Sequence, residues 1–414
     1  MIMLITMYQA KELKCLMFGL ACDKDSFEKY LEKNKNPYSV AHYIFETEFI
    51  MQLEKNYNID HNYIYQENNK NLKNARIKKR NNNITNLTKT SWINYYNLPI
   101  LKYITIFIST FVRILKYSKK NKDFFILSTI NYLPVAMATI IASKMINKKN
   151  VIIFTDCSNS NAYDYSEQMF IKSLFVRILR KIVYLCENQY DGYILFSECM
   201  GELVNKSNKP SCVMEGFINE RMLNLSKEKK FDDFIILYGG SLLKNLGLEN
   251  LIEAVKEILD VQLWIVGDGS IKSQLMDLAS GYDNIKFCGF VPREQLFEME
   301  KKASLLVNVR DPRLPYTRYS FPSKTFEYLL SGTPFLSTKL ACYSNEYNQH
   351  IYFINDNQVE TIKTEIINIK NLSQREREKF GEDATNFVLN EKNAGTQCKK
   401  VIEFLNSEVL NVFK

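Results

Sequence analysis

Short apolar runs alternate with longer amphipathic segments along the C-terminal half of the chain. The runs are typical of buried strands, and the segments carry apolar residues three and four positions apart, which is typical of helices. The first such segment should bury one face that runs from Leu248 to Leu259. Strands are therefore predicted at 233–240, 261–269, 284–290, 304–309 and 334–338, and helices at 248–259, 270–279 and 292–303.

This alternation of strand and helix with short connections indicates βαβ units and hence a parallel sheet. The N-terminal half repeats it less regularly, with strands predicted at 14–22, 123–129, 150–156, 191–197 and 211–217 and helices at 40–56, 134–146 and 168–189. Between them, Tyr65–Thr90 is rich in Asn and Lys and has no periodicity, so it is predicted to be a mobile polar loop.

A chain of 414 residues is too long for one ordinary core, so two domains are expected. The apolar pattern gives way to charge at 218–232, which is predicted to be a linker. We therefore expect an α/β fold of two doubly wound parallel sheets, 1–217 and 233–392, with a terminal helix at 393–414. In such sheets ligands bind at the carboxyl ends of the strands.

One further predicted helix, Pro322–Ser331, carries a carboxylate in its middle. Pro322 suits a first helical turn, and Gly332 suits the position just after the last. Glu327 should lie on a polar stripe that leads to the helix N-terminus, where unpaired N–H groups and the dipole attract phosphate. A carboxylate there could accept both hydroxyl groups of a ribose, with Lys324 adding a cation. The same stripe could equally be a solvated helix face.

The segment before this helix carries Arg310, Arg313 and Arg318 together with two tyrosines. It follows a predicted strand, so it should lie at the carboxyl edge of the sheet, where phosphate sites form. This position favours a nucleotide site over a solvated face.

Four stretches give the chain a resemblance to a known family: "YGGSLLKNLGLENLIEA", "LWIVGDGS", "IKFCGFVPREQL" and "SFPSKTFEYLLSGTPFLSTKL". In order and spacing they resemble the family-4 retaining glycosyltransferases of the GT-B fold, especially the bacterial branch that builds capsule, exopolysaccharide or O-antigen. The resemblance covers most of Asp233–Asn355 and extends more loosely to "VIIFTD" and "DGYILFSECM". It implies two Rossmann-like domains facing across a cleft, an acceptor-side N-terminal domain, a nucleotide-sugar-binding C-terminal domain and a terminal helix that crosses back.

The resemblance also implies roles for single residues. Glu327 corresponds to the second glutamate of the family's Glu-x7-Glu motif and would bind the donor ribose. The matching glycines would let backbone approach the nucleotide closely. The expected binding set is Gly239, Gly240, Lys244, Gly267, Gly269, Gly289, Phe290, Arg310, Ser323, Lys324 and Glu327, and the expected catalytic set is Asp156, Tyr319 and Lys324.

The chain departs from the family pattern at the positions of several charged groups. Tyr319 stands where the first motif glutamate is expected. Ser241 and Leu246 stand where an Arg and a Lys commonly bind the diphosphate, so Lys244 and Lys324 are the expected substitutes.

In the N-terminal domain, Thr155 replaces the histidine that usually lies near the donor sugar, and Asp156 follows it. Asp156 could hydrogen-bond the acceptor or the donor sugar, or it could cap the following segment. His42, His61 and His350 are far apart in the sequence, so no metal site or catalytic triad is expected from them.

The function that the resemblance implies is transfer of a sugar from a nucleotide-diphosphate sugar, UDP-linked, to a lipid-linked or growing glycan acceptor. Transfer would proceed with retention, in surface polysaccharide synthesis, and without a cofactor or metal, because the helix dipole and cations would stabilise the departing diphosphate. A non-catalytic nucleotide-sugar-binding partner of another glycosyltransferase is the alternative, which Tyr319 favours. A Rossmann oxidoreductase is disfavoured because "VGDGSIKS" lacks the third glycine of G-x-G-x-x-G.

Composition narrows the choice of partners and compartment. The formal net charge of +8 and the pI of about 8.8 suit nucleic acid, anionic membrane or phosphorylated substrates. The sequence has no RNP1 pattern and no zinc-finger spacing, which disfavours nucleic acid. The 9 cysteines are scattered and form no CxxC, so they are expected to be buried free thiols in a reducing cytoplasm.

Two segments, 104–122 and 171–185, are basic, apolar and aromatic at helical spacing. They could lie in a membrane interface and bind anionic lipid, or they could simply cover the sheet. No transmembrane helix is expected, because Lys102 and Arg113 interrupt the longest apolar run, and no secretory signal is visible. The expected location is the cytoplasm, with peripheral attachment to the inner face of the cell membrane left open.

Overall fold

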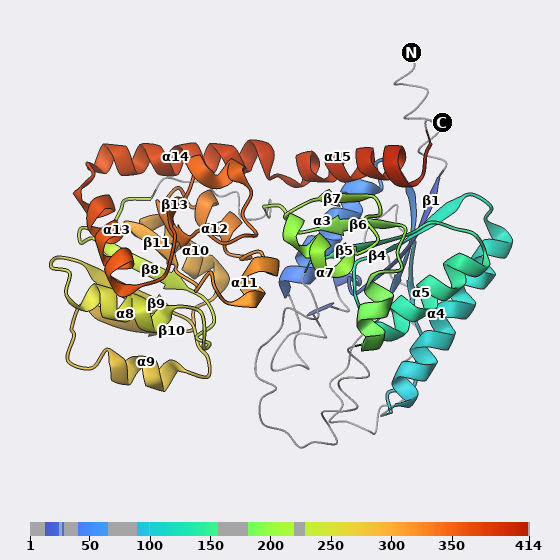
Figure 1. Ribbon diagram of the computed structural model, residues 1–414, viewed down its shortest axis with the longest axis horizontal. Helices are drawn as coiled ribbons and strands as arrows, with labels where there is room; N and C mark the ends of the chain where they lie inside the picture. Colours follow the sequence, from blue (N-terminus) through green and yellow to red (C-terminus); the bar gives the residue numbers. More distant parts are fainter. Residues whose placement is uncertain are drawn as a thin grey trace, which may run out of the picture. The chain divides into compact units, whose positions relative to one another are not determined.

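The computed structural model describes residues 13–24, 27–28, 40–64, 89–98, 100–155, 181–218 and 228–412 (Figure 1). The chain forms two compact units, one made of Met1–Gly216 with Ala394–Lys414 and one made of Phe217–Asn393. It therefore leaves the first unit once and returns to it near the C-terminus.

The first unit is built on a seven-stranded parallel sheet with the order β3-β2-β1-β4-β5-β6-β7. The strands are β1 (Lys14–Gly19), β2 (Asn58–Tyr63), β3 (Lys89–Trp92), β4 (Phe124–Ser128), β5 (Asn150–Phe154), β6 (Gly192–Leu195) and β7 (Ser211–Val213). The helices are α3 (Val40–Leu53), α4 (Leu101–Lys120), α5 (Leu133–Met145), η2 (Glu198–Met200), α7 (Gly201–Val204), α15 (Ala394–Phe404) and the π-helical turn η5 (Leu405–Val409).

The returning C-terminal segment is part of the core of the first unit. Helix α15 packs on α3, and the buried hydroxyl of Tyr57 donates a hydrogen bond to Oδ1 of Asn406 at 2.9 Å. Val409 packs so closely on Gly192 of β6 that a Cβ there would lie 2.8 Å from a Val409 methyl group. The predicted terminal helix therefore crosses back to the first sheet.

The second unit has a six-stranded parallel sheet with the order β10-β9-β8-β11-β12-β13. Its strands are β8 (Ile235–Gly239), β9 (Gln262–Val266), β10 (Ile285–Gly289), β11 (Leu305–Asn308), β12 (Phe335–Thr338) and β13 (Tyr352–Ile354). Its helices are α8 (Leu248–Lys256), α9 (Lys272–Leu278), α10 (Arg293–Lys302), α11 (Pro315–Tyr319), α12 (Thr325–Leu330), η4 (Asn345–Gln349), α13 (Val359–Asn371) and α14 (Gln374–Glu391). This is the strand order of a Rossmann fold, and the prediction of two parallel α/β sheets is confirmed.

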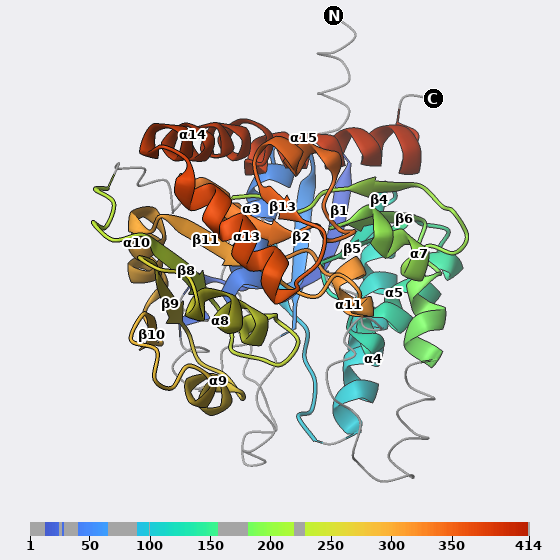
Figure 2. The ribbon, with the colours of Figure 1, turned by 60° about the vertical axis from the view of Figure 1, so that its left-hand side comes forward.

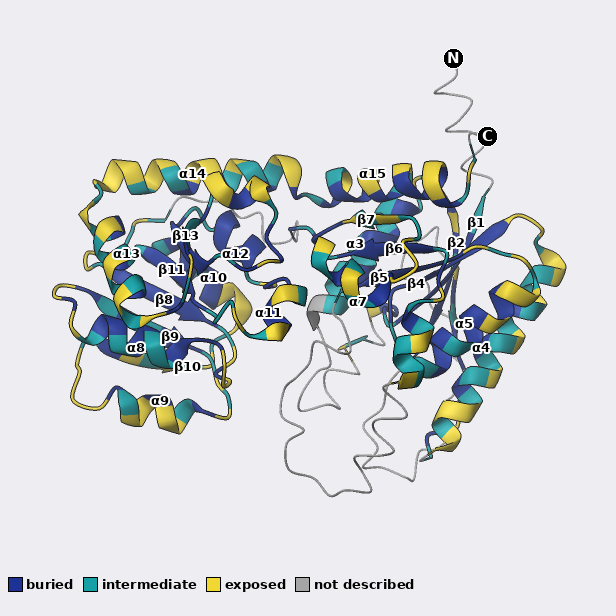
Figure 3. Cartoon of the chain, in the orientation of Figure 1, coloured by how far each residue is buried: buried dark blue, intermediate teal, exposed yellow. Residues whose placement is uncertain are grey.

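Helices cover both faces of the second sheet, as successive strand residues show. Leu336 of β12 packs in a core cluster with α8 and α13, whereas the ring of its neighbour Phe335 lies 5.1 Å from that of Tyr328 on α12. Figure 2 shows α8 and α13 side by side, and Figure 3 shows that the strands between the helix layers are buried.

Helix α8 is shorter than its apolar pattern predicts. It ends at Lys256, and the chain then turns, with Asp260 in a left-handed conformation (φ 55°). Leu248, Leu251 and Val255 are buried as expected, but Leu259 is 81% exposed because it lies beyond the end of the helix. Its predicted place on the buried face is therefore wrong.

The first unit contains two strands, β2 and β3, that the sequence pattern does not show. The predicted mobile loop Tyr65–Thr90 overlaps β3, because Lys89 and Thr90 pair with β2; residues 65–88 lie outside the described residues. Most of the predicted helix 168–189 also lies outside them, and the described part is helical from 181 to 187.

The cysteines are less uniformly buried than expected. Cys15, Cys22, Cys342 and Cys398 are buried, but Cys288 is exposed, so the prediction is wrong for that thiol. Within the described ranges, no helix combines the length and the apolar character that crossing a bilayer would require.

Candidate functional site

Three strands of the second unit end at the same edge of the sheet in glycine-containing turns. β8 ends at Gly239 and β10 at Gly289, and both are aligned with Val266, the last residue of β9. The N–H of Gly240 donates to the carbonyl of Val266 at 2.9 Å, and the N–H of Gly267 donates to that of Gly289 at 2.8 Å. The strand order reverses between β8 and β11, and doubly wound sheets bind ligands at such a point.

Packing between the loops requires two of the predicted glycines. Gly267 has a φ of 143°, and a Cβ there would lie 1.8 Å from the carbonyl oxygen of Gly240. A Cβ on Gly269 would lie 2.1 Å from the carbonyl oxygen of Leu242. Both distances are far below van der Waals contact, so the loops after β8 and β9 pack backbone against backbone. Backbone packing alone therefore requires glycine at both positions, whether or not a ligand binds.

The loop after β8 is also held on its other side. A Cβ on Gly247 (φ 82°) would lie 2.0 Å from the carbonyl oxygen of Val309. The hydroxyl of Tyr316, on α11, donates a hydrogen bond to the carbonyl of Asn245 at 2.8 Å. The loop that exposes Lys244 is therefore fixed between the β9 loop and the segment after β11.

Glu327 is buried among charged groups on α12. Its exposed fraction is 8%, so the solvated helix face that the sequence allowed is wrong. The helix begins at Thr325, three residues later than the expected Pro322. One oxygen of Glu327 lies 3.4 Å from Nε of Arg293, on α10, and the other lies 4.0 Å from Nζ of Lys324. The structure thus brings the predicted residues Glu327 and Lys324 together and adds Arg293.

A second carboxyl, Glu300 on α10, lies on the other side of Lys324. Its Oε1 is 4.0 Å from Nζ of Lys324, and it is fully buried. Neither of its oxygens has a hydrogen-bond partner among the described residues. Burial, and next the charge of Glu327, raise the pKa of Glu300 well above its usual range, and Lys324 and Arg293 oppose this shift.

Sequence reasoning missed Glu300, although a signal was present. Leu296 and Phe297 mark the buried face of α10, and Glu300 follows them at a spacing of four and three residues. A carboxylate on an apolar helix face is uncommon, because burying its charge is costly. That position therefore deserved to be a candidate site residue.

Tyr328 connects α12 to the glycine turn after β8. Its hydroxyl accepts a hydrogen bond from the N–H of Gly239 at 3.0 Å and lies 3.3 Å from the carbonyl oxygen of the same residue. Glu300 lies against this turn as well, since a Cβ on Gly239 would be 3.3 Å from its Oε1. The charged cluster and the glycine turn therefore form one continuous site.

The remaining predicted site residues are less closely connected. Ser323 is exposed, as is Phe290, at 80%. Arg310 follows β11, and its Nε is buried without a hydrogen-bond partner among the described residues. Tyr319 ends α11 and is partly exposed, and Asp156 lies outside the described residues.

Chemically, this edge of the sheet combines two partly exposed cations with two buried carboxyls. The side chains of Arg293 and Lys324 are 42% and 28% exposed, so an anion can reach both. Guanidinium and ammonium groups are the usual partners of phosphate, and a carboxylate such as Glu327 accepts hydrogen bonds from sugar hydroxyls. The arrangement suits a ligand that carries both phosphate and ribose.

The first unit contains a buried charged cluster that the sequence did not predict. Both oxygens of Glu46 are used: Oε2 accepts from the N–H groups of Leu20 and Ala21 at 2.9 and 3.1 Å, and Oε1 lies 3.0 Å from Nε2 of His61. His42, one turn before Glu46 on α3, lies 3.3 Å from Oε2. His42 and His61, which are far apart in the sequence, therefore meet at one carboxylate.

This cluster fixes the loop after β1 at the carboxyl edge of the first sheet. Burial raises the pKa of Glu46, but the hydrogen bonds and charges of His42 and His61 outweigh it and hold that pKa well below its usual range. Glu46 is therefore a carboxylate that anchors the loop. In the part of the chain that the structure describes, no group of three or more His, Cys, Asp or Glu side chains is arranged to hold a metal ion.

Parts of the sequence are similar to known glycosyltransferases. Residues 233–371 match the family model described as "Glycosyl transferases group 1". A lipopolysaccharide core biosynthesis glycosyltransferase, LpsD of Rhizobium meliloti (strain 1021), is 37% identical over 62 residues. That match covers 14% of this chain and spans 18% of the relative's length.

Solved structures resemble the whole chain at low identity. HepE from Anabaena, in complex with UDP, has a TM-score of 0.63 at 12% identity and covers 95% of this chain and 100% of its own. Sucrose-phosphate synthase from Thermosynechococcus elongatus has a TM-score of 0.65 at 14% identity, with 97% and 100% covered. The lipopolysaccharide outer core galactosyltransferase WaaB has a TM-score of 0.61 at 11% identity and covers 95% of this chain and 99% of its own. The chain therefore has the GT-B fold of these structures, and residues 233–371 of its second unit match the glycosyl transferases group 1 model.

Proposed function

We propose that the protein is a glycosyltransferase that moves a sugar from a UDP-linked donor to a lipid-linked or growing glycan acceptor, with retention, in surface polysaccharide synthesis. One observation carries the proposal. The group 1 match at 233–371 spans the glycine-containing turns after β8, β9 and β10 and the Lys324–Glu327 pair. The donor class is supported by HepE, whose structures hold UDP or UDP-glucose.

In this proposal, different residues of the second unit bind different parts of the donor. Glu327 accepts hydrogen bonds from the ribose hydroxyls, and the turns at Gly239 and Gly267 lie beside the diphosphate. Lys324 and Arg293 stabilise the negative charge that develops on the departing diphosphate. The proposed reaction uses no metal and no cofactor, since the two cations supply positive charge at that point.

A second function is favoured by Tyr319. In the resembling family a glutamate occupies that position, and here an aromatic side chain lies at the end of α11. We therefore keep a non-catalytic nucleotide-sugar-binding partner of another glycosyltransferase as the alternative. It predicts donor binding without turnover.

The experiment is a screen of UDP- and GDP-sugars for hydrolysis or transfer, with lipid-linked acceptors, by wild type, Glu327→Ala and Glu327→Gln. Glu294→Ala is the control, because Glu294 is an exposed carboxylate of the same unit. Turnover of one donor that is lost in both Glu327 variants supports the enzyme. Donor binding without turnover for every donor and acceptor supports the alternative.

The two Glu327 variants also separate binding from folding. Glu327 is buried between cations, so Glu327→Ala removes packing volume as well as charge, whereas Glu327→Gln keeps the volume. Weaker donor binding in both, with the melting temperature of Glu327→Gln near that of wild type, supports the ribose role. Unfolding of both variants would show that the residue is structural.

The proposed location is the cytoplasm, with peripheral attachment to an anionic membrane surface. Support comes from α4, which exposes Leu101, Tyr103, Ile104, Ile108 and Val112 to solvent and ends in Lys119 and Lys120. An amphipathic helix of this kind is suited to a membrane interface.

A further inference from the structure

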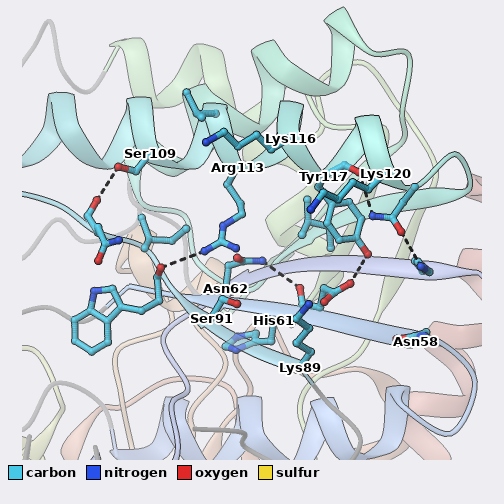
Figure 4. Close-up of a pocket in the computed structure, with 18 of the residues that line it drawn as sticks. Asn58, His61, Asn62, Lys89, Ser91, Ser109, Arg113, Lys116, Tyr117 and Lys120 are labelled. Carbon is cyan, nitrogen blue, oxygen red and sulfur yellow. Dashed lines mark hydrogen bonds between the residues drawn. The ribbon is translucent and has the colours of Figure 1, made fainter. Parts of the chain in front are cut away.

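The first unit has a pocket of about 830 Å³ between α4 and the strands β1, β2 and β3 (Figure 4). Alternate residues of the strands line it, among them Lys14, Asp60, Asn62 and Ser91. Lys14 and Lys89 are the first residues of β1 and β3. The pocket therefore extends along the face of the sheet from the amino ends of β1 and β3 to Ile93 and Asn94, which follow the last residue of β3.

The pocket carries a surplus of positive charge. Its lining includes Lys14, Lys89, Arg113, Lys116 and Lys120, whereas the carboxylate of Asp60 is the only one among the described lining residues. That carboxylate already accepts a hydrogen bond of 2.5 Å from the hydroxyl of Tyr117.

Within the described ranges, none of these five cations forms an ion pair with a carboxylate, whereas Lys256, Lys301 and Lys363 of the second unit each do. The positive charge of the pocket is therefore not neutralised by the part of the protein that the structure describes.

Two of the cations are held in place by neutral groups. Nζ of Lys14 donates to Oδ1 of Asn121 at 2.6 Å, and Nη2 of Arg113 lies 3.4 Å from the carbonyl oxygen of Trp92. Arg113 is partly buried, and burial lowers its pKa, a shift that the charge of Asp60 opposes. Partial burial of a guanidinium that forms no ion pair is unfavourable, so an anion bound in the pocket would stabilise the charged form of Arg113.

The rim of the pocket is apolar on the side of α4. Ile104, Ile108 and Val112 are 49%, 50% and 38% exposed and follow each other at four-residue spacing. Ile108 and Val112 line the pocket as well. An exposed apolar stripe directly beside unneutralised cations is complementary to a molecule with an anionic head and an apolar tail.

We propose that this pocket binds the phosphate headgroup of an anionic membrane lipid. Arg113, Lys116 and Lys120 bind the phosphate oxygens, since charge-assisted hydrogen bonds to phosphate are the strongest such contacts that these groups make. Ile104, Ile108 and Val112 lie among the first carbons of the lipid chains. A soluble phosphate would use the cations but leave the stripe exposed, so the stripe favours a lipid. The site is independent of the donor site in the second unit.

The experiment is flotation of the full chain with vesicles of phosphatidylglycerol and phosphatidylcholine, against vesicles of phosphatidylcholine alone. We expect binding to the anionic vesicles, and a loss of about fivefold in affinity per neutralised cation, or about thirtyfold for Lys116→Gln with Lys120→Gln. The matched control is Lys149→Gln with Lys206→Gln, which removes the same charge from exposed positions of the same unit outside the pocket. If the two double variants lose the same affinity for anionic vesicles, the effect comes from net charge alone and the pocket proposal is wrong.

Two further measurements complete the test. Arg113→Gln alone should weaken vesicle binding while UDP binding, measured by calorimetry, stays at the wild-type value. This proposal rests on the proposed membrane attachment, and that result separates it from the proposed sugar transfer, since either can fail without the other. Inorganic pyrophosphate is the soluble probe, and its binding is measured as slower hydrogen exchange of the α4 amides in wild type but not in Arg113→Gln. If pyrophosphate binds in this way and anionic vesicles do not bind, the pocket recognises soluble phosphate and the lipid proposal is wrong. If neither the anionic vesicles nor pyrophosphate bind, the proposed site is wrong.

Discussion

Glu300 and Lys324 meet at the centre of the charged cluster of the second unit, with Oε1 of the buried carboxyl 4.0 Å from the ammonium nitrogen. The raised pKa of Glu300 makes the folded state bind a proton more tightly than the unfolded state does. The free energy of unfolding should therefore fall as the pH rises above the ordinary glutamate value.

Glu300→Gln should remove this pH dependence, because glutamine mimics the protonated carboxyl and does not titrate. We expect the variant and wild type to have the same melting temperature near pH 4.5, and the variant to become the more stable one as the pH rises to 8. Thermal unfolding at a series of pH values measures this. Glu294→Gln, at an exposed position of the same helix, is the control, and parallel profiles for Glu300→Gln and wild type would contradict the assignment.

Gly267→Ala should disrupt the turn after β9. The new Cβ would lie 1.8 Å from the carbonyl oxygen of Gly240, at a φ of 143° that alanine rarely adopts. We expect a loss of about 3–5 kcal/mol in the free energy of unfolding. Gly281→Ala has a positive φ but nothing within 4 Å of the new Cβ, so it should cost only about 1–2 kcal/mol. Urea unfolding followed by the fluorescence of Trp264, on β9, compares them, and equal costs would rule out the packing argument.

Glu46→Gln should destabilise the first unit by about 2–4 kcal/mol at pH 7, because the N–H groups of Leu20 and Ala21 and the buried ring of His61 lose a charged acceptor. Since the folded-state pKa of Glu46 is depressed, this contribution is present above the ordinary glutamate pKa and is lost as the pH falls through the folded-state value. The difference between wild type and variant should therefore shrink in acid.

The matched control for this prediction is Glu48→Gln. Glu48 lies two residues further along α3, is partly exposed and accepts a hydrogen bond from Nε2 of Gln52 at 2.9 Å. It should cost less than about 0.5 kcal/mol. The fluorescence of Trp92, on β3, reports on the first unit, and a cost for Glu46→Gln no larger than that of the control would refute the anchoring role.

Phe290→Ala should weaken UDP binding without changing stability. The ring is 80% exposed, so its removal costs the fold almost nothing, whereas loss of a stacking contact with a base is worth about 1–3 kcal/mol, or at least fivefold in Kd. Calorimetric titration with UDP measures this, with Met276→Ala as an exposed control from α9. An unchanged Kd would remove Phe290 from the binding set.

Hydrophobic periodicity was sufficient to predict β8 to β12 of the second sheet, because most of these strands are short apolar runs between amphipathic segments. It did not predict the three-residue edge strand β13 (Tyr352–Ile354). It failed for β2, in which Ile59 and Tyr63 stand on one side of the alternation but the polar residue His61 lies between them, so the apolar series is interrupted. This strand is nevertheless buried because its polar side chains find partners on other elements, His61 with Glu46 and Asp60 with Tyr117. Such partners come from α3 and α4 and are not visible in the strand itself.

The candidate site was predicted in part for a similar reason. The helix pattern indicated Lys324 and Glu327, and the family resemblance indicated the glycine turns. Arg293 and Glu300 reach the same place from α10, which precedes α12 in the chain, and only the packing of the two helices on one face of the sheet brings their side chains together. Residues that act through tertiary contacts need the fold before they can be recognised.

The return of the chain to the first unit at Ala394 has a consequence for biosynthesis. The second unit is continuous in sequence and can fold as soon as its last residue has emerged from the ribosome. The first unit cannot, because α15, Asn406 and Val409 belong to its core and are translated after the whole of the second unit. The half of the protein that is made first is therefore the half that is completed last, and until then it exposes the surface of α3 on which α15 will pack.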